Sequence, residues 1–470
     1  MKKINFSIIG ILIVFAVAFW SCEDRTDLTE PGAPSLGNAD FSTFVSFGNS
    51  LTAGYQNGAL YESTQKYSFG NLIAQQVGAN YVQPLISDPG IPGRLEVKSI
   101  EPFEVVTNTT LGQPKNTSYG KPYNNLGIPG ALLVDFLQAK DASTSISGDN
   151  IFFDIVLRGN GTELEQAISL KPTFMTLWVG NNDILGYATR GGTVPHTPTD
   201  LFAQLYGQLA GAIATQTNAK VVVANIPGVQ AVPYFTTVGP GVAQAIKPAV
   251  DAGLAVGVFY NTNGQIGATA PNNVATVDAL VKGDVLLTLT LSSYGYTDLI
   301  GQPTGKFYRD NGIDPALVGA DTTKPFGLHP ANPIPDAFVL DPAEIQEVNN
   351  TVESFNQTIA GIASANGWAL VDVNAFFKQT AANGYVANGV KFTTQYVTGG
   401  LFSLDGVHPT SQGYAIIANL FIDKINEAFG ANIPKVNVTT IPGSLVLAKV
   451  SFDKYGIPKL DKNAFANFPF

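Results

Sequence analysis

Residues 44–55 read FVSFGNSLTAGY, an apolar run that stops abruptly at a small polar pair. Residues 43–47 have the length and composition of a buried strand, and Gly48 marks its end. Asn49 and Ser50 follow directly. A hydroxyl group placed just after a buried strand serves either as a helix cap or as a nucleophile. The rest of the sequence bears on which of the two roles Ser50 has.

Other β-branched and aromatic runs resemble this first one, and each is followed by Gly, Asn or Pro. They are residues 172–179 (PTFMTLWV), 220–225 (KVVVAN) and 368–373 (WALVDV). Apolar residues recur at spacings of three and four over 342–366 and on one side of 411–429, which predicts two amphipathic helices. Strands that alternate with helices are typical of parallel α/β folds. We therefore predict a three-layer α/β/α sandwich with a mostly parallel sheet.

The overall composition narrows the range of functions. The chain has 470 residues, of which 45% are hydrophobic and 13% charged, as in a globular protein. Its net charge is −10, with 26 Lys and Arg against 36 Asp and Glu. Binding to a phosphate backbone requires clustered positive charge, so we expect no nucleic-acid partner.

The N-terminus has the features of an export signal. Lys2 and Lys3 precede an uncharged apolar stretch over residues 6–20, which is short for a membrane span and suits a secretory signal. Cys22, the only cysteine, comes directly after it, as in the lipidated cysteine of bacterial lipoproteins. We predict a signal peptide over 1–21 and an exported lipoprotein of the outer membrane, anchored through a lipid on Cys22 and periplasmic or at the cell surface. An uncleaved N-terminal anchor is the alternative.

A serine nucleophile requires a base, and the base requires an orienting group. Only three histidines occur in the chain, and only His408 has a carboxylate within three residues, Asp405. A turn over Asp405 and Gly406 would bring the carboxylate to one ring nitrogen of His408 and fix its tautomer. Taken alone, the same pattern also describes a turn that caps the helix beginning near Ser411.

Acyl transfer also requires hydrogen-bond donors for an oxyanion. Two loops with suitable backbone and amide groups are Asn125 to Gly130 (NLGIPG) and Gly180 to Asp183 (GNND). The second loop comes directly after a predicted strand. Each loop by itself is also an ordinary turn.

Taken together and in this order, four motifs resemble the SGNH or GDSL-type hydrolase family. They are GNSLTAGY (48–55), NLGIPGA (125–131), VGNND (179–183) and DGVHPT (405–410). The resemblance implies that Ser50 is the nucleophile, Asp405 the acid and His408 the base of a catalytic triad. It implies an oxyanion hole made by the N–H groups of Ser50 and Gly130 and the side-chain amide of Asn182. The chain departs from the family pattern at Asn49, where the family usually has Asp.

The resemblance implies the flavodoxin-like fold of this family and serine-dependent hydrolysis of carboxylic esters through an acyl-enzyme, as in lipases, acylhydrolases and esterases. It implies no cofactor and no metal. The substrate is then a small-molecule, lipid or glycan ester. A carbohydrate deacetylase or an acyltransferase of the same fold stays open, as does a catalytically silent binding lipoprotein at the cell surface.

The domain organisation follows from the same motifs. We predict a polar tether over 22–40 and a hydrolase domain over 41–430. Two Gly-, Pro- and turn-rich stretches, at about 85–121 and 228–341, are predicted to be insertions over the ligand end of the sheet. Residues 431–470 are predicted to form a C-terminal extension. Its apolar stretch SLVLAKVSF is consistent with a hairpin at the edge of a sheet.

Overall fold

A sheet of four parallel strands forms the centre of the computed structural model, which describes residues 33–443 and 453–466. The strands lie in the order β1-β4-β5-β10. Their bounds are Phe44–Gly48 (β1), Phe174–Trp178 (β4), Lys220–Ala224 (β5) and Ala369–Val371 (β10). Each strand coincides, to within one residue, with part of a run that the sequence predicts. The α/β fold with a parallel sheet is confirmed.

Both faces of the sheet are buried, as expected for parallel strands. Val45 and Met175 pack into the hydrophobic core on one face, whereas Phe44 and Phe174 pack into the core on the other. This alternation follows from the two-residue period of a strand. A run of consecutive apolar residues therefore serves both cores at once.

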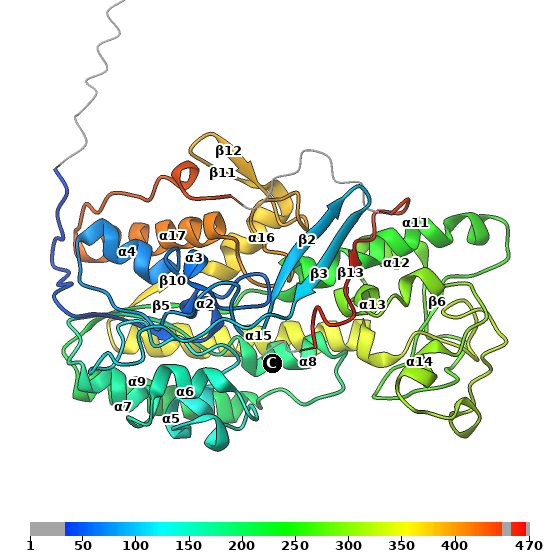
Figure 1. Ribbon diagram of the computed structural model, residues 1–470, viewed down its shortest axis with the longest axis horizontal. Coiled ribbons are helices and arrows are strands. Elements are labelled where there is room, and N and C mark those ends of the chain that lie inside the picture. The colour runs from blue at the N-terminus through cyan, green and yellow to red at the C-terminus, as the bar shows by residue number, and fades with distance from the viewer. Residues whose placement is uncertain (1–32, 444–452, 467–470) are drawn as a thin grey trace, which may run out of the picture.

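Helices cover the two faces and complete the three layers. Figure 1 shows α4 and α17 above the strands and α5, α7 and α9 below them. The helices on the first face are α4 (Phe69–Val77), α16 (Val373–Asn383) and α17 (Ser411–Phe429). Those on the second face are α5 (Leu133–Gln138), α6 (Ile151–Leu157), α7 (Glu163–Ser169), α8 (Asn182–Thr189), α9 (Thr199–Gln216) and α15 (Pro342–Ala365).

The two helices predicted from apolar periodicity are α15 and α17, with bounds that agree to within one residue. α15 begins at a capping box, in which Asp341 accepts from the N–H of Glu344 while the Glu344 side chain accepts from the N–H of Asp341. Such reciprocal bonds satisfy two backbone donors that a helix start would leave unpaired.

The first predicted insertion contains an antiparallel hairpin, which the sequence analysis did not predict. Its strands are β2 (Arg94–Ile100) and β3 (Phe103–Asn108). β13 (Lys459–Leu460), from the C-terminal extension, pairs with β3 in parallel. Residues 444–452, on which the prediction of an edge hairpin depends, lie outside the described residues.

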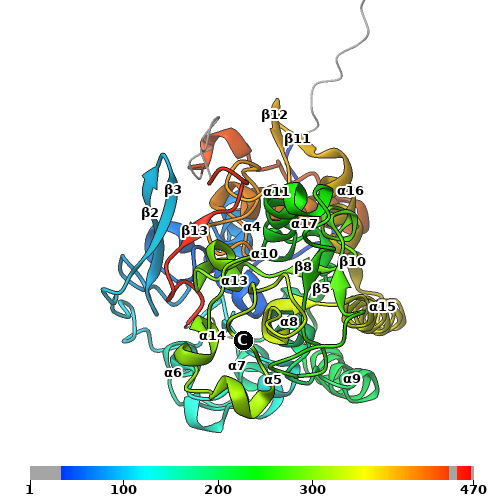
Figure 2. The ribbon, with the colours of Figure 1, turned by 90° about the vertical axis from the view of Figure 1, so that its right-hand side faces the viewer.

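The second predicted insertion combines short helices and strands with long irregular stretches, and it lies at the right-hand end of Figure 1, facing the viewer in Figure 2. Its helices are α10 (Pro233–Thr236), α11 (Val238–Asp251), α12 (Val277–Lys282), α13 (Leu289–Ser293) and α14 (Lys306–Asp310). Its short strands are β6 (Val258–Phe259), β7 (Val274–Ala275), β8 (Leu286–Leu287) and β9 (Val339–Leu340). Elsewhere, short elements are α2 (Ser50–Ala53), α3 (Glu62–Gln65), β11 (Tyr385–Ala387) and β12 (Val390–Phe392).

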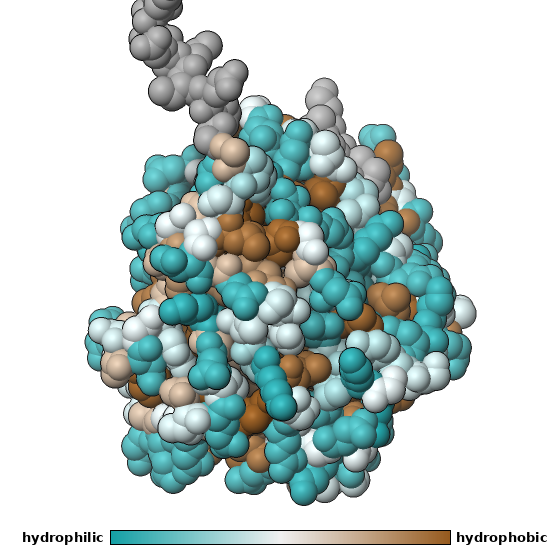
Figure 3. All heavy atoms as spheres, turned by 90° about the vertical axis from the view of Figure 1, so that its left-hand side faces the viewer, coloured by the Kyte–Doolittle hydropathy of each residue, from teal (hydrophilic) through white to brown (hydrophobic). Residues whose placement is uncertain are grey.

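The described chain begins at residue 33 at the left-hand end of Figure 1, the end away from the second insertion. Seen from that end in Figure 3, hydrophilic residues cover much of the surface, and hydrophobic ones appear in smaller areas between them. Within residues 33–443 and 453–466, no helix has both the length and the apolar character that crossing a membrane requires.

Candidate active site

Ser50 is the first residue of α2, which begins directly after β1. The cap of this helix is Asn49, whose side-chain oxygen accepts a hydrogen bond from the backbone N–H of Leu51 at 3.3 Å. Because Asn49 caps the helix, the hydroxyl group of Ser50 is available for another role. Of the two residues that follow the first strand, Asn49 therefore caps the helix and Ser50 remains the candidate nucleophile.

Gly48 allows the end of β1 to lie close against β4. Its φ is +156°, and a Cβ there would lie 2.3 Å from the carbonyl oxygen of Trp178 and 2.4 Å from Thr52 Oγ1. Both distances are too short for any side chain. Glycine at this position is therefore required to hold Ser50 at the strand end.

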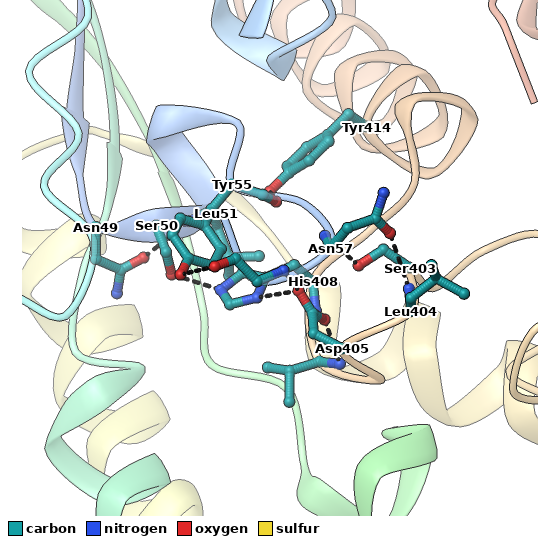
Figure 4. Close-up of polar contacts among 12 residues, drawn as sticks. Asn49, Ser50, Leu51, Tyr55, Asn57, Ser403, Leu404, Asp405, His408 and Tyr414 are labelled. Carbon is teal, nitrogen blue, oxygen red and sulfur yellow. Dashed lines mark hydrogen bonds and ion pairs between the residues drawn. The ribbon is translucent and has the colours of Figure 1, made fainter. Parts of the chain in front are cut away.

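Ser50, His408 and Asp405 lie in one chain of contacts, although the first is more than 350 positions from the other two. His408 Nε2 is 2.9 Å from Ser50 Oγ, and His408 Nδ1 is 3.1 Å from Asp405 Oδ2. Figure 4 shows the imidazole ring between the hydroxyl and the carboxylate. With Nδ1 donating to the carboxylate, Nε2 can accept the hydroxyl proton. All three residues are buried.

Asp405 is held as a carboxylate by four N–H donors. Its Oδ1 accepts from the backbone N–H groups of Val407 and His408, and its Oδ2 from the backbone N–H of Gly58 and the ring of His408. Burial pushes the pKa of Asp405 upward, but the charge and hydrogen bonds of His408 and the N–H of Val407 outweigh it, so that the pKa lies below its usual value.

The loop of the second motif lies beside the strand that leads to Ser50. Leu126 N–H donates to the carbonyl of Ser46, and Ile128 N–H to the carbonyl of Gly48, both at 2.9 Å. Gly130 follows two residues later with a φ of +80°, a conformation that glycine adopts without strain. The contacts with β1 thus bring the Gly130 loop alongside the turn that carries Ser50.

The third motif begins α8 and is tied to the Gly130 loop. Asn182 Nδ2 donates to the carbonyl of Ala131 at 2.9 Å, which leaves its second hydrogen for another acceptor. Asp183 accepts from the N–H of Leu133 at 3.0 Å and from the Thr197 hydroxyl at 2.7 Å. Burial raises the pKa of Asp183 to about 6. The structure therefore brings the residues of all four predicted motifs to one place.

The model of the GDSL-like lipase/acylhydrolase family matches residues 44–298 and 302–421 of this chain, which contain all of these motifs. The chain belongs to that family. The predicted family resemblance is confirmed, and with it the coarse conclusion that the protein is a hydrolase. A search of curated proteins finds no match to this GDSL-like hydrolase.

Three solved structures similar to this GDSL-like hydrolase each have 12% sequence identity to it. The first, an alpha/beta hydrolase from the metagenome of Lake Arreo in Spain, has a TM-score of 0.33 and is covered over 96% of its chain by 83% of this one. The second is a phospholipase A1 from Streptomyces albidoflavus, with a TM-score of 0.32; the match covers 100% of its chain and 82% of this one. The third is a mutant of an acetyl xylan esterase from Geobacillus stearothermophilus, with a TM-score of 0.31; the match covers 95% of its chain and 82% of this one.

A narrow pocket of about 60 Å³ opens beside Ser50 in this GDSL-like hydrolase. Ser50, Asn181, Asn182 and His408 are its polar lining residues. The remaining walls are apolar and come from the end of β4, α2, α8, α16, the loop after β5 and the His408 loop: Leu51, Trp178, Ile184, Leu185, Ile226, Pro227, Val229, Val232, Phe377, Phe402, Val407 and Pro409. The second insertion touches the His408 loop, because Tyr234 N–H donates to the Gly406 carbonyl at 3.0 Å.

Asn57 is part of the site's framework, and the sequence analysis missed it. Its N–H donates to Ser403 Oγ and its Oδ1 accepts from the N–H of Leu404, both at 3.0 Å. Figure 4 shows these bonds joining the loop after α2 to the loop that carries Asp405. Asn57 and Gly58 have φ of 54° and 75°. An Asn-Gly pair is the strongest short-range signal for such a tight turn, so the sequence did contain a clue.

Glu163, the first residue of α7, is a second buried carboxyl group that the sequence analysis missed. Its Oε1 accepts from the backbone N–H of Gly48 at 3.1 Å, and its Oε2 has no partner among the described residues. Burial raises the pKa of Glu163 well above its usual value. The group that supports the turn before Ser50 thus favours its neutral, protonated form.

The other two histidines lie in different surroundings. His196 Nε2 contacts Glu347 at 3.0 Å, and His329 Nδ1 accepts from the N–H of Ala331 at 3.1 Å. Across residues 33–443 and 453–466, no group of three or more His, Cys, Asp or Glu side chains is arranged to hold a metal ion. Cys22, the predicted lipidation site, lies outside the described residues.

Proposed function

We propose that the protein hydrolyses carboxylic esters through an acyl-enzyme formed on Ser50. The observation that carries this proposal is the pair of contacts made by His408, 2.9 Å to Ser50 Oγ and 3.1 Å to Asp405 Oδ2. A serine hydroxyl becomes an effective nucleophile when a base accepts its proton and a third group orients that base. The family match and the four N–H donors to Asp405 support the same assignment.

The reaction begins when Ser50 Oγ attacks the ester carbonyl carbon and its proton moves to His408 Nε2. The tetrahedral intermediate collapses, the bond from carbon to the alcohol oxygen breaks, and His408 gives the proton to the departing alcohol. Water then attacks the acyl-enzyme and gives a proton to His408. The bond from the acyl carbon to Ser50 Oγ breaks, His408 returns the proton to Ser50 Oγ, and the acid is released. Asp405 stays ionised throughout and stabilises the protonated ring of His408.

The negative charge of the intermediate would be held by the N–H groups of Ser50 and Gly130 and by the side-chain amide of Asn182. The bond from Asn182 to the Ala131 carbonyl fixes this amide while leaving one N–H available. Removing one donor from a preorganised oxyanion hole costs about 3 kcal/mol of transition-state stabilisation. Asn182→Leu is therefore expected to lower kcat about 100-fold.

The apolar walls of the pocket favour esters of apolar acids over acetyl esters of sugars. Each methylene group of an acyl chain that leaves water for such a pocket contributes about 0.8 kcal/mol. The pocket is narrow, so we expect a preference for short and medium acyl chains over palmitoyl.

Hydrolysis of p-nitrophenyl esters from acetate to palmitate by the full chain, beside Ser50→Ala, tests this function. We expect activity that disappears in the variant, with the highest kcat/KM at butanoate to octanoate. Added alcohols that yield new esters in place of free acid would point to an acyltransferase. Equal rates from both proteins on every ester would contradict a serine esterase and favour a binding protein.

We also propose that the protein is exported and anchored to a membrane by a lipid on Cys22, with the site facing lipid or glycan esters outside the cytoplasm. The support comes from the N-terminal sequence, Lys2 to Cys22. Incorporation of labelled palmitate into the full chain, but not into Cys22→Ala, is the expected result. Equal labelling would contradict it.

A further inference from the structure

Glu163 is a buried carboxyl group that contacts the turn of the nucleophile but does not line the pocket beside it. Only 1% of its surface is exposed, and it is the first residue of α7, on the second face of the sheet. Its Oε1 accepts from the N–H of Gly48 at 3.1 Å, whereas its Oε2 has no partner among the described residues. Burying a carboxylate is costly, and a neutral amide would satisfy the same N–H. An ionisable group at this position therefore calls for an explanation.

Gly48, which Glu163 contacts, joins the two backbone donors of the proposed oxyanion hole. Its carbonyl accepts from the N–H of Ile128 at 2.9 Å, so the two segments that carry the donors meet at this residue. Ser50 comes two residues after Gly48, and Gly130 comes two residues after Ile128. The relative position of the two donors therefore depends on how firmly Gly48 is held.

A side chain does at Gly48 what the backbone does two residues earlier. The N–H of Ser46 donates to the carbonyl of Asn124 at 2.8 Å, where the neighbouring segment runs parallel to β1. The N–H of Gly48 donates instead to Glu163, from a helix that lies 115 positions away in the sequence. The hold on this peptide group thus comes from a side chain whose charge changes with pH.

We propose that Glu163 is a positioning residue that holds the peptide group before Ser50 while it is neutral and that slows catalysis when it ionises. The proposal rests on the proposed ester hydrolysis at Ser50. Neutral Glu163 fixes Gly48, and through Gly48 it keeps the N–H groups of Ser50 and Gly130 in place. A glutamine would supply the same hydrogen bond but could not respond to pH.

The charge of an ionised Glu163 would act directly against the negative intermediate. Two residues of chain span at most about 7 Å, so the carboxyl group that contacts Gly48 lies within about 10 Å of the N–H of Ser50. At an effective dielectric constant of about 20, a negative charge about 10 Å from an oxyanion slows its formation roughly tenfold. Ionisation of this one buried group is therefore enough to lower the rate measurably.

Burial keeps Glu163 neutral, and one neighbouring carboxyl group adds to the effect. Burial raises the pKa of Glu163 well above its usual value, the bond from Gly48 lowers it, and the charge of Asp135 on α5 raises it. Of the other elements that pack against α7, β1 has no titratable side chain, and α9 has the exposed Asp200 and the buried Tyr206. Glu163 is thus neutral at low pH and ionises as the pH rises through its raised pKa.

Two variants separate the hydrogen bond of Glu163 from its charge. Glu163→Gln keeps an oxygen for the N–H of Gly48, whereas Glu163→Leu removes it. With p-nitrophenyl butanoate at pH 6, Glu163→Gln should keep kcat within about threefold of the original value. Glu163→Leu should lower kcat about tenfold or more at an unchanged KM, because a misplaced turn weakens only the binding of the transition state. Equal kcat values for the two variants would overturn the proposal.

The pH profile of kcat tests the charge, and it does so even if Glu163→Leu fails to fold. Between pH 5 and 9.5, kcat of the original protein should fall roughly tenfold as Glu163 ionises, and Glu163→Gln should show no such fall. A carboxyl group with a merely structural role would not move this profile. Glu165→Gln, at an exposed carboxyl group of the same helix that accepts from the N–H of Thr162, should follow the original protein. Parallel profiles for the original protein and Glu163→Gln would overturn the proposal.

Hydrogen exchange in the inactive Ser50→Ala protein tests the positioning without turnover. Adding Glu163→Leu should speed amide exchange over residues 44–55 about fivefold, as expected for the loss of one hydrogen bond, and adding Glu163→Gln should not. Exchange over α17, on the opposite face of the sheet, should stay the same in both. Equal exchange over 44–55 in the two variants would contradict the hold on the turn. If hydrolysis by the original protein equals that of Ser50→Ala while the exchange difference persists, the proposed reaction fails and the hold of Glu163 on this turn stands.

Discussion

The two sides of Ser50 differ in how completely their polar groups are paired. On the base side, Asp405 accepts four N–H bonds, and His408 contacts both the carboxylate and the nucleophile. On the other side, both side-chain polar atoms of Asn181 and Oδ1 of Asn182 have no partner among the described residues. The base is thus positioned before any substrate arrives, whereas the opposite side keeps buried amide atoms that have no hydrogen-bond partner among the described residues.

This difference fits the demands of the proposed reaction. A base works best when its tautomer and orientation are fixed in advance, because no reorganisation is then required as the proton moves. Groups that bind the substrate or the oxyanion must keep hydrogen-bonding capacity in reserve. Changes on the base side are therefore expected to affect kcat through proton transfer. Changes on the other side are expected to affect kcat where they remove an oxyanion donor, as at Asn182, and stability where they alter an unpaired buried group.

Asp405→Asn should have the largest effect, because it breaks the base side at its centre. An asparagine cannot accept from all four donors, and its NH₂ group favours the wrong tautomer of His408. We expect kcat for p-nitrophenyl butanoate to fall about 10⁴-fold, as when the acid of a serine-protease triad is changed in this way. Asp423→Asn, at an exposed ion pair with Lys435, is the control and should retain full activity. A loss below about tenfold would contradict the role of Asp405.

Asn57→Gly should loosen the base side without removing any triad member. Glycine accepts the φ of 54° without strain, so the change removes only the side-chain bonds to Leu404 N–H and to the Tyr61 hydroxyl. We expect kcat to fall about tenfold, with a shifted pH profile of kcat/KM because Asp405 is held less firmly against His408. A change in stability alone, with the same kcat and pH profile, would reduce Asn57 to a purely structural residue.

Glu163→Gln tests the other side of Ser50 through the dependence of stability on pH. The folded protein raises the pKa of Glu163, so it binds a proton that the unfolded chain releases once the pH exceeds the ordinary pKa of Glu. Stability is then lost as pH rises from that value toward the raised one. Glutamine mimics the protonated form. The free energy of unfolding of the variant, relative to that of the original protein, should therefore increase by about 1.4 kcal/mol per pH unit across this window. Urea unfolding of both proteins at pH 4 to 7.5 measures this change. A difference in the free energy of unfolding that stays constant with pH would contradict a protonated Glu163.

Asn49→Asp should have the smallest effect, although it restores the residue that the family usually has next to its nucleophile. Aspartate keeps the oxygen that accepts from Leu51 N–H and replaces Nδ2, which has no partner among the described residues. We expect kcat/KM to stay within about tenfold of the original value. Complete inactivation would show that the amide at position 49 is essential to the turn.

The sequence predicts the features that depend on local pattern. The runs at 172–179 and 220–225 are short, apolar and bounded by turn residues, and they become β4 and β5. The periodicity of 342–366 becomes α15 because one face of that helix is buried in the core. The chemistry of the four motifs is equally local, since each motif supplies its residues within one loop.

Features that depend on distant contacts were not predicted. The hairpin β2–β3 alternates apolar and charged residues, as in Leu95 and Glu96, but its Gly- and Pro-rich surroundings favoured a loop. α11 forms despite Pro248 in its interior, because packing against the core overrides its weak propensity. The contacts of Glu163 with Gly48 and of Gly58 with Asp405 join positions 115 and 347 residues apart, which no local pattern reveals.

The central claim is that Ser50, activated by His408, forms a covalent bond to the substrate. Incubation of the full chain with a fluorophosphonate, followed by peptide-mapping mass spectrometry, tests it most directly, because the phosphonyl group is retained on the attacking oxygen. We predict a single adduct, located on Ser50, that is absent in Ser50→Ala and forms far more slowly in His408→Ala. Labelling at another residue, or equal labelling of Ser50→Ala, would contradict the proposed mechanism.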